Sequence, residues 1–166
     1  MKISIITPTV RPEGLPIMAR CLKRQDFTDW EWIISAPKRL FRAINDQLKS
    51  IVDYRFVPEP PKQKGDFYRL CGAWNVAFRE ARGELFISLQ DWIWFPPDTL
   101  SRFWRHYQAN PKAIIAPIGH HYQRIENDKP EEKVWQDPRA RLDQGTFYEV
   151  APTEVEFSLC SLPKRA

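Results

Sequence analysis

The chain has 166 residues, of which 43% are hydrophobic and seven are Trp, so it is long enough to bury one core and is not a disordered chain. Its formal charge of +4 comes from scattered Lys and Arg, which excludes a basic arm for nucleic acid but is compatible with an anionic partner. The three Cys, Cys21, Cys71 and Cys160, have no CxxC spacing, which favours buried thiols in a reducing compartment over disulfides or a zinc site.

Short apolar runs alternate with helical patterns along most of the chain. Strands are predicted where apolar residues run together and stop at Pro or polar residues, and helices where apolar residues recur every three to four positions. Pro12 suits the first turn of the first helix, while Asp66 and Gly83 are signals for the start and the stop of the third. In chain order, the predicted elements are a strand at 3–6, a helix at 13–24, a strand at 30–35, a helix at 40–51, a strand at 54–57, a helix at 66–82, a strand at 85–89, a helix at 97–107 and a strand at 113–118.

This alternation predicts a three-layer α/β domain on a mostly parallel sheet with right-handed crossovers. We assign that domain to residues 1–119 and treat residues 120–166, where the pattern blurs, as a partial extension. Ligands of such sheets bind beyond the carboxyl ends of the strands. The polar residues directly after the first, second and fourth strands are therefore the candidates for a site.

Four parts of the sequence, taken together, resemble one family. They are residues 3–9, 22–25 with 30–34, 74–77 with 81–87, and 90–92 with 96–100. The first ends in Thr7-Pro8-Thr9, and the last holds Gln90-Asp91-Trp92 where an aspartate motif is expected. In order and spacing they resemble the nucleotide-binding half of family 2 glycosyltransferases, which have the GT-A fold. The resemblance implies transfer of a sugar from a nucleotide-diphosphate sugar to an acceptor, whose identity it does not give.

The resemblance also implies a divalent cation, Mg²⁺ or Mn²⁺, that bridges the diphosphate and is held by two aspartates after the fourth strand. Here one carboxylate, Asp91, is left to bind the metal, and Gln90 can lend a neutral oxygen. The alternative is that Asp91 caps a turn before the Pro-rich segment.

Several residues are expected at the nucleotide because they match family positions or lie at strand ends. They are Thr7, Pro8, Thr9, Arg11, Ser35, Asp66, Asn75, Gln90 and Asp91. Each polar one also has a structural interpretation: a Thr hydroxyl can satisfy a turn, Arg11 can be solvated, Asp66 can cap a helix, and a buried Asn75 needs partners in either role. Family members carry aspartates after the second strand, where this chain has Ser35-Ala36-Pro37, so the base contact falls to Ser35 or to backbone groups.

Trp92 and Trp94 flank Asp91 at the expected mouth of the site. Their faces can stack on a sugar or acceptor, and they can equally cover a hydrophobic edge of the sheet. His106 is taken as structural, and the adjacent His120-His121 lacks the spacing of a metal pair.

An inverting transferase needs a general base for the acceptor hydroxyl. In the family that acid follows a small-residue stretch ending in Pro-Arg or Pro-Lys, which 157–164 resembles. We therefore expect that the part bearing the base is absent from this chain, with Glu154 as a fallback base.

Three functions compete on these residues: a sugar transferase or its donor-binding part, a nucleotide-sugar-binding scaffold without chemistry, and a nucleotidyltransferase. The scaffold is favoured by the missing aspartates, and the third is disfavoured because no Gly-rich phosphate loop follows the first strand. No signal peptide or membrane span is visible, so we expect a cytoplasmic protein. An exposed apolar patch and self-association into a homo-oligomer are also expected.

Overall fold

The computed structural model describes residues 1–61, 70–117, 121–122, 147–148 and 161–163. The elements are, in chain order, β1 (Ile3–Pro8), the 3-10 helix η1 (Pro12–Gly14), α1 (Leu15–Lys23), β2 (Trp30–Ala36), the 3-10 helix η2 (Lys38–Leu40), α2 (Phe41–Leu48), β3 (Arg55–Pro58), α3 (Leu70–Glu80), β4 (Leu85–Ser88), α4 (Thr99–Ala109), β5 (His121–Tyr122), β6 (Phe147–Tyr148) and β7 (Ser161–Pro163). No helix within these ranges is long and apolar enough to cross a membrane.

The main sheet has the strand order β3-β2-β1-β4-β7. β1 pairs in parallel with both β2 and β4, and β2 pairs in parallel with β3. The first four predicted strands are therefore confirmed as one parallel sheet, and the α/β class is confirmed with it. β5 and β6 form a separate two-stranded antiparallel pair.

The predicted fifth strand at 113–118 is wrong for its described part. Residues 113–117 form no strand, and Ile114 is 59% exposed. The apolar run suggested a strand, but it is short, and Pro117 has no N–H to donate to a ladder. The edge beside β4 is instead occupied by β7, which pairs antiparallel with it. Most of the predicted extension, residues 120–166, lies outside the described residues.

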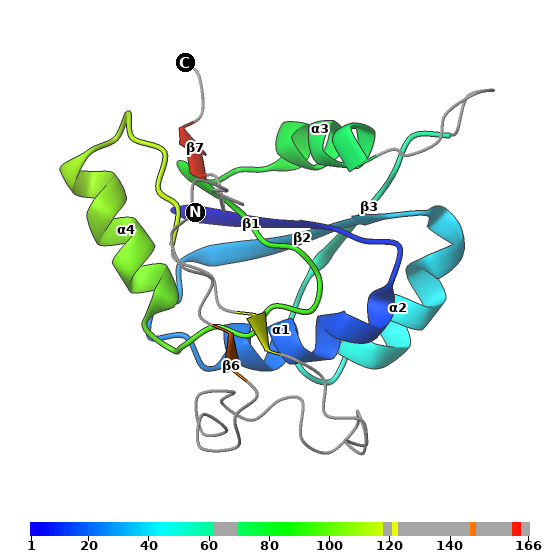
Figure 1. Ribbon diagram of the computed structural model, residues 1–166. Helices are drawn as coiled ribbons and strands as arrows, with labels where there is room; N and C mark the ends of the chain where they lie inside the picture. Colours follow the sequence, from blue (N-terminus) through cyan, green and yellow to red (C-terminus); the bar gives the residue numbers. More distant parts are fainter. Residues whose placement is uncertain (62–69, 118–120, 123–146, 149–160, 164–166) are drawn as a thin grey trace.

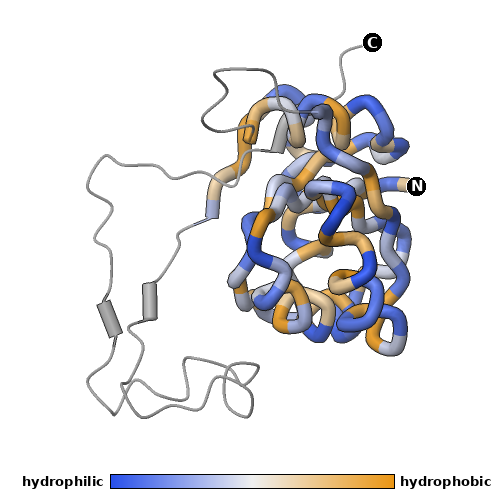
Figure 2. The backbone as a smooth tube through the Cα atoms, turned by 90° about the vertical axis from the view of Figure 1, so that its right-hand side faces the viewer, coloured by the Kyte–Doolittle hydropathy of each residue, from blue (hydrophilic) through white to orange (hydrophobic). Residues whose placement is uncertain are grey.

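Alternate side chains of each strand point to opposite faces of the sheet, and both faces are covered. One face, with Ile5, Trp32 and Ile87, packs in the main core against α1, α2 and α4. The other face, with Ile6 and Ile33, packs against α3. Figure 1 shows α3 on one side of the strands and α1 with α2 on the other, which confirms the three layers. Figure 2 shows apolar and polar stretches alternating along the tube, as strands buried between two helical layers require.

The amino ends of the strands are held together by Glu31 of β2. Its carboxylate accepts hydrogen bonds from Ser4 Oγ of β1 at 2.7 Å, from the Arg82 backbone N–H at 2.7 Å and from the Arg55 guanidinium of β3 at 2.9 Å. A Cβ on Gly83 would lie 2.5 Å from the Ser4 backbone N, so only glycine fits the turn before β4. We call these residues the amino-edge network, and it ties three strands to the α3–β4 turn.

Candidate functional site

The carboxyl ends of β1 and β4 lie side by side at the point where the strand order reverses. From β1 the chain moves to β2 and β3 on one side, and it then returns through α3 to β4 on the other side of β1. The segments after β1 and β4 therefore emerge from the sheet next to each other at this reversal point, which we call the carboxyl edge. This is the position at which parallel α/β sheets bind their ligands.

Asp91, just after β4, reaches across to the segment after β1. Its Oδ2 accepts a hydrogen bond from Thr9 Oγ1 at 2.8 Å, and its Oδ1 accepts one from the Arg11 guanidinium at 2.8 Å. Thr9 Oγ1 in turn accepts from the Arg11 backbone N–H at 2.9 Å. Three of the residues predicted at the nucleotide are thus brought together, and we call them the Thr9–Arg11–Asp91 cluster.

The segment carrying Asp91 is anchored on both sides. Leu89 is buried, and its N–H donates to the Ile6 carbonyl at 3.0 Å. Phe95 is buried in the main core. Beyond it, the buried Gln25 side chain donates to the Pro96 carbonyl at 2.8 Å and accepts from the Leu100 N–H at 3.0 Å. The position of Asp91 is therefore set by the fold rather than by a free loop.

Trp92 adopts a backbone conformation that a bulky residue rarely takes. Its φ is 66°, in the left-handed region, and its side chain is 46% exposed. The loop also lies so close to η1 that a Cβ on Gly14 would fall 2.6 Å from the Trp92 backbone N and from its ring. Strained backbone of this kind gathers at functional sites, where the surrounding packing holds it in place.

The cluster exposes a cation rather than an anion. The Asp91 side chain is only 8% exposed, whereas the Arg11 side chain is 67% exposed. A buried carboxylate that is ion-paired and accepts a hydroxyl hydrogen bond keeps its charge compensated. A ligand at the carboxyl edge would therefore meet mainly the guanidinium.

Ser35 lies at the end of β2, next to the cluster. Its carbonyl accepts from the Thr9 N–H at 2.9 Å, and its register partner in β1 is Pro8, which is buried. The Ser35 hydroxyl is fully buried and has no hydrogen-bond partner within the described part of the chain. A buried hydroxyl without a partner is costly, so Ser35 is a candidate for contact with a ligand or with a segment that packs over β2.

The other predicted residues do not join the cluster. Thr7 Oγ1 accepts from Trp32 Nε1 at 3.0 Å within the main core, and Trp94 is half-buried against that core. Gln90 is exposed, and Asn75 is exposed on α3, whose buried residues are Ala73 and Ala77. Asp66 and Glu154 lie outside the described residues, as does the expected start of the third helix.

A divalent cation does not fit the donors that the described residues supply. Among them there is no group of three or more His, Cys, Asp and Glu side chains that could hold a metal. Asp91 is the one carboxylate of the cluster, and both its oxygens already accept hydrogen bonds. Each oxygen keeps a second lone pair, but the Arg11 guanidinium bonded to Oδ1 repels a divalent cation placed beside it, so the cluster as it stands favours metal binding poorly.

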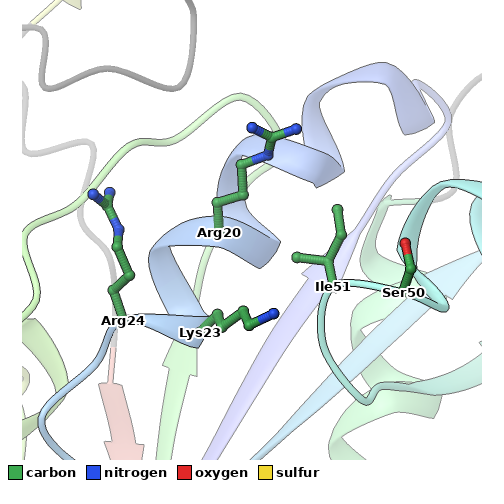
Figure 3. A pocket seen from close by; sticks show the side chains of 5 residues that line it. All are labelled: Arg20, Lys23, Arg24, Ser50 and Ile51. Atoms are coloured by element: carbon green, nitrogen blue, oxygen red, sulfur yellow. The ribbon is translucent and has the colours of Figure 1, made fainter.

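Two surface hollows lie at the opposite end of the sheet. One, of 320 Å³, is lined by three basic side chains from the end of α1, with Ser50 and Ile51 opposite them (Figure 3). Cations at a helix C-terminus are favourable for the helix dipole, which accounts for them without a ligand. The other, of 500 Å³, lies beside the amino-edge network and includes Tyr54, whose pKa is raised by burial and, to a lesser extent, by the charge of Asp46.

Comparison with known proteins identifies both a family and a fold. The model of the family described as Glycosyl transferase family 2 matches residues 4–159. No curated protein shows significant sequence similarity to the chain. Among solved structures, S. aureus TarS superposes with a TM-score of 0.57 at 16% identity, over 80% of this chain and 24% of that one. TarS 1–349 in complex with UDP gives a TM-score of 0.59 at 16% identity, and the complex with UDP-GlcNAc gives 0.57 at 16%. This chain covers 40% and 39% of those two, so it spans well under half the length of its structural neighbours.

Proposed function

The chain belongs to glycosyl transferase family 2, and on that premise we propose that it binds a nucleotide-diphosphate sugar at the carboxyl ends of β1, β2 and β4 and serves in transfer of the sugar to an acceptor. The observation that carries the proposal is the Thr9–Arg11–Asp91 cluster at the point where the strand order reverses. Two segments about 80 positions apart in the sequence meet there through paired charges at the place where this fold class binds ligands.

The nucleotide is assigned by analogy with solved neighbours. TarS, which shares the fold, is found in complexes with UDP and UDP-GlcNAc. We therefore take UDP as the first nucleotide to test for this chain. Ser35, with its buried hydroxyl at the end of β2, is the residue proposed to meet the base or the ribose, in place of the aspartates expected there.

The chemistry would proceed by displacement at the anomeric carbon. The acceptor oxygen forms the new bond, the bond from the sugar to the diphosphate breaks, and its electron pair leaves with the nucleoside diphosphate. The hydroxyl proton passes to a carboxylate base, for which the sequence offers Glu154 only as a fallback. Stabilising the growing charge on the leaving diphosphate requires positive charge beside it, and the cluster exposes a guanidinium.

Members of the family often use a divalent metal. Because the described donors do not fit one as they stand, no step is routed through a metal here. An unidentified acceptor, a cytoplasmic location and self-association remain predictions from the sequence.

A thermal-shift titration tests the proposal. UDP, GDP, CDP and dTDP are added to the wild-type chain and to Ser35→Ala, which removes the hydroxyl and adds no atoms to the buried position. We expect one nucleotide, UDP first, to raise the melting temperature in proportion to the logarithm of its concentration, and the alanine variant to weaken that shift. If none of the four nucleotides changes the melting temperature, the chain has no working donor site and the proposal is wrong.

A donor-binding scaffold is the second candidate. It is favoured by the full engagement of Asp91 with Thr9 and Arg11 and by Ser35 at the position where an acid is expected. Incubation with radiolabelled UDP-GlcNAc separates the two. Release of UDP, to water or to an added acceptor, supports the transferase, whereas tight binding without any release supports the scaffold.

A further inference from the structure

We propose that Arg11, held in place by Asp91, supplies the positive charge that binds the donor's diphosphate, in the role that the family resemblance gives to a carboxylate-bound metal. This inference rests on the proposed function, because it names the group that holds the diphosphate in that same site. Asp91 then acts as a positioning residue for Arg11 rather than as a metal ligand.

Asp91 is already engaged through both of its oxygens. Oδ1 is bonded to the Arg11 guanidinium and Oδ2 to the Thr9 hydroxyl, both at 2.8 Å. Hydrogen bonds between a guanidinium and a carboxylate are about twice as strong as neutral ones. With only 8% of its side chain exposed, Asp91 has little surface from which to recruit a hydrated cation.

Arg11 is preorganised by its neighbours. Its backbone N–H donates to Thr9 Oγ1, and the next residue, the buried Pro12, starts η1 and has a fixed φ. Both the backbone and the guanidinium of Arg11 are therefore anchored on the same two side chains. A guanidinium fixed in this way loses less entropy when it binds phosphate oxygens, which it can do with two parallel hydrogen bonds.

Positive charge is exposed at the carboxyl edge of the sheet. Arg11 is 67% exposed, and Lys38 and Arg39, just after β2, are exposed as well. The acid of the cluster is buried beneath the guanidinium. An anion such as a diphosphate therefore meets net positive charge without a metal.

Asp91 is not easily turned away from Arg11. The segment that carries it lies close to Gly14 at Trp92 and is anchored at Leu89 and Phe95, so its backbone is held in place. Turning the Asp91 carboxylate away would break its hydrogen bonds to both Thr9 and Arg11.

Nucleotide affinity with and without metal tests the proposal. The nucleotide that stabilises the chain most, UDP first, is titrated calorimetrically in EDTA and in Mn²⁺, against the wild type, Arg11→Met, Arg11→Lys and Asp91→Asn. We expect wild-type affinity in EDTA to match that in Mn²⁺ within about two-fold, and Arg11→Met to weaken it roughly 10- to 100-fold, the range for a lost charge-assisted hydrogen bond. Arg11→Lys keeps the charge and should recover part of the loss, and Asp91→Asn should fall between the wild type and Arg11→Met.

Two controls separate binding of the diphosphate from a loss of structure. Uridine lacks the diphosphate, so its affinity should not change in Arg11→Met. Arg102→Met removes another exposed Arg that is ion-paired with an Asp, at 2.7 Å, and it should leave the affinity for UDP unchanged. Mn²⁺ binding by electron paramagnetic resonance should be weak in the wild type and stronger in Arg11→Met, which frees the Asp91 carboxylate.

The possible results separate this inference from the proposed function. Nucleotide binding that needs Mn²⁺ and survives Arg11→Met overturns this inference and leaves the proposed function standing. This inference is likewise overturned if Arg11→Met weakens uridine binding as much as UDP binding, since Arg11 would then act on the structure alone. If no nucleotide binds under any condition, the proposed function fails and this inference fails with it.

Discussion

Two ion pairs of the same chemistry lie at opposite edges of the sheet. At the amino edge Arg55 contacts Glu31 at 2.9 Å, and at the carboxyl edge Arg11 contacts Asp91 at 2.8 Å. The carboxylates are almost equally buried, with 12% and 8% of their side chains exposed. The arginines differ: 28% of Arg55 is exposed but 67% of Arg11.

The difference follows from what each carboxylate connects. Glu31 accepts hydrogen bonds from two neighbouring strands and from the α3–β4 turn, and Arg55 also contacts Glu80. The polar groups of the amino-edge network are therefore bonded to one another. The two partners of Asp91 named above belong to a single segment, and the guanidinium among them is exposed. A buried pair with many protein partners serves the fold, whereas a buried acid under an exposed cation is suited to a ligand. Substitutions at the two edges should therefore have different consequences.

The largest effect on stability is expected at the amino edge. Glu31→Ala removes three hydrogen bonds and leaves Arg55 without its closest ion-pair partner, so the free energy of unfolding should fall by about 3 kcal/mol. Urea denaturation measures this loss. Asp46→Ala, which breaks exposed pairs with Arg42 and Lys49, is the matched control and should change stability by less than about 0.5 kcal/mol. If the two variants lose the same unfolding free energy, the amino-edge network does not stabilise the fold more than an exposed ion pair does.

The Gly14→Ala substitution is expected to lower both stability and nucleotide affinity, with a smaller loss of stability than Glu31→Ala. A Cβ there would meet the Trp92 backbone and ring at 2.6 Å, so Gly14→Ala should displace the segment bearing Asp91, with a loss of roughly 1–3 kcal/mol. The same variant should weaken nucleotide binding, because the Thr9–Arg11–Asp91 cluster depends on that segment. Gly72→Ala is the control, since its Cβ would meet only the Pro60 side chain at 3.8 Å. Unchanged melting temperature and unchanged nucleotide affinity in Gly14→Ala would show that the close approach does not set the site.

Much of the fold could be predicted from the sequence, because strands and crossover helices have strong periodic signals. The patterns around Ile5, Trp32 and Ile87 gave four strands in a parallel sheet, and strand ends placed Thr9 and Asp91 near each other. The pairing of Arg11 with Asp91 could not be predicted, since it depends on how two loops 80 residues apart turn toward each other. The edge strand β7 was missed because three residues, Ser161–Pro163, carry no periodic signal. The positive φ of Trp92 has no signal in its residue type, which disfavours it.

Asp91→Ala should lower the free energy of unfolding less than Glu31→Ala does, and it should weaken UDP binding more. Its exposed partner Arg11 can turn to water, and the buried Thr9 hydroxyl still accepts from the Arg11 backbone N–H, so we expect a loss of about 1 kcal/mol in unfolding free energy. Measured side by side by urea denaturation and by calorimetry with UDP, the two variants should rank in opposite order. An Asp91→Ala chain that unfolds as readily as Glu31→Ala would assign Asp91 to the fold instead.

The smallest effect is expected at Trp92. Trp92→Asn trades some partly exposed packing for a residue that tolerates a positive φ, so the two changes should offset to within about 1 kcal/mol. A melting curve of the variant measures the balance. A much larger loss would mean that the indole, rather than the backbone around it, holds the segment in place.

The role assigned to Arg11 is tested most directly by a crystal structure of the chain with UDP, grown in EDTA. We predict the diphosphate at the carboxyl ends of β1 and β4, with its oxygens within hydrogen-bond distance of the Arg11 guanidinium and the Arg11–Asp91 pair intact. UDP bound instead in the basic hollow at the end of α1, or at the carboxyl edge with Asp91 turned away from Arg11, would contradict that role.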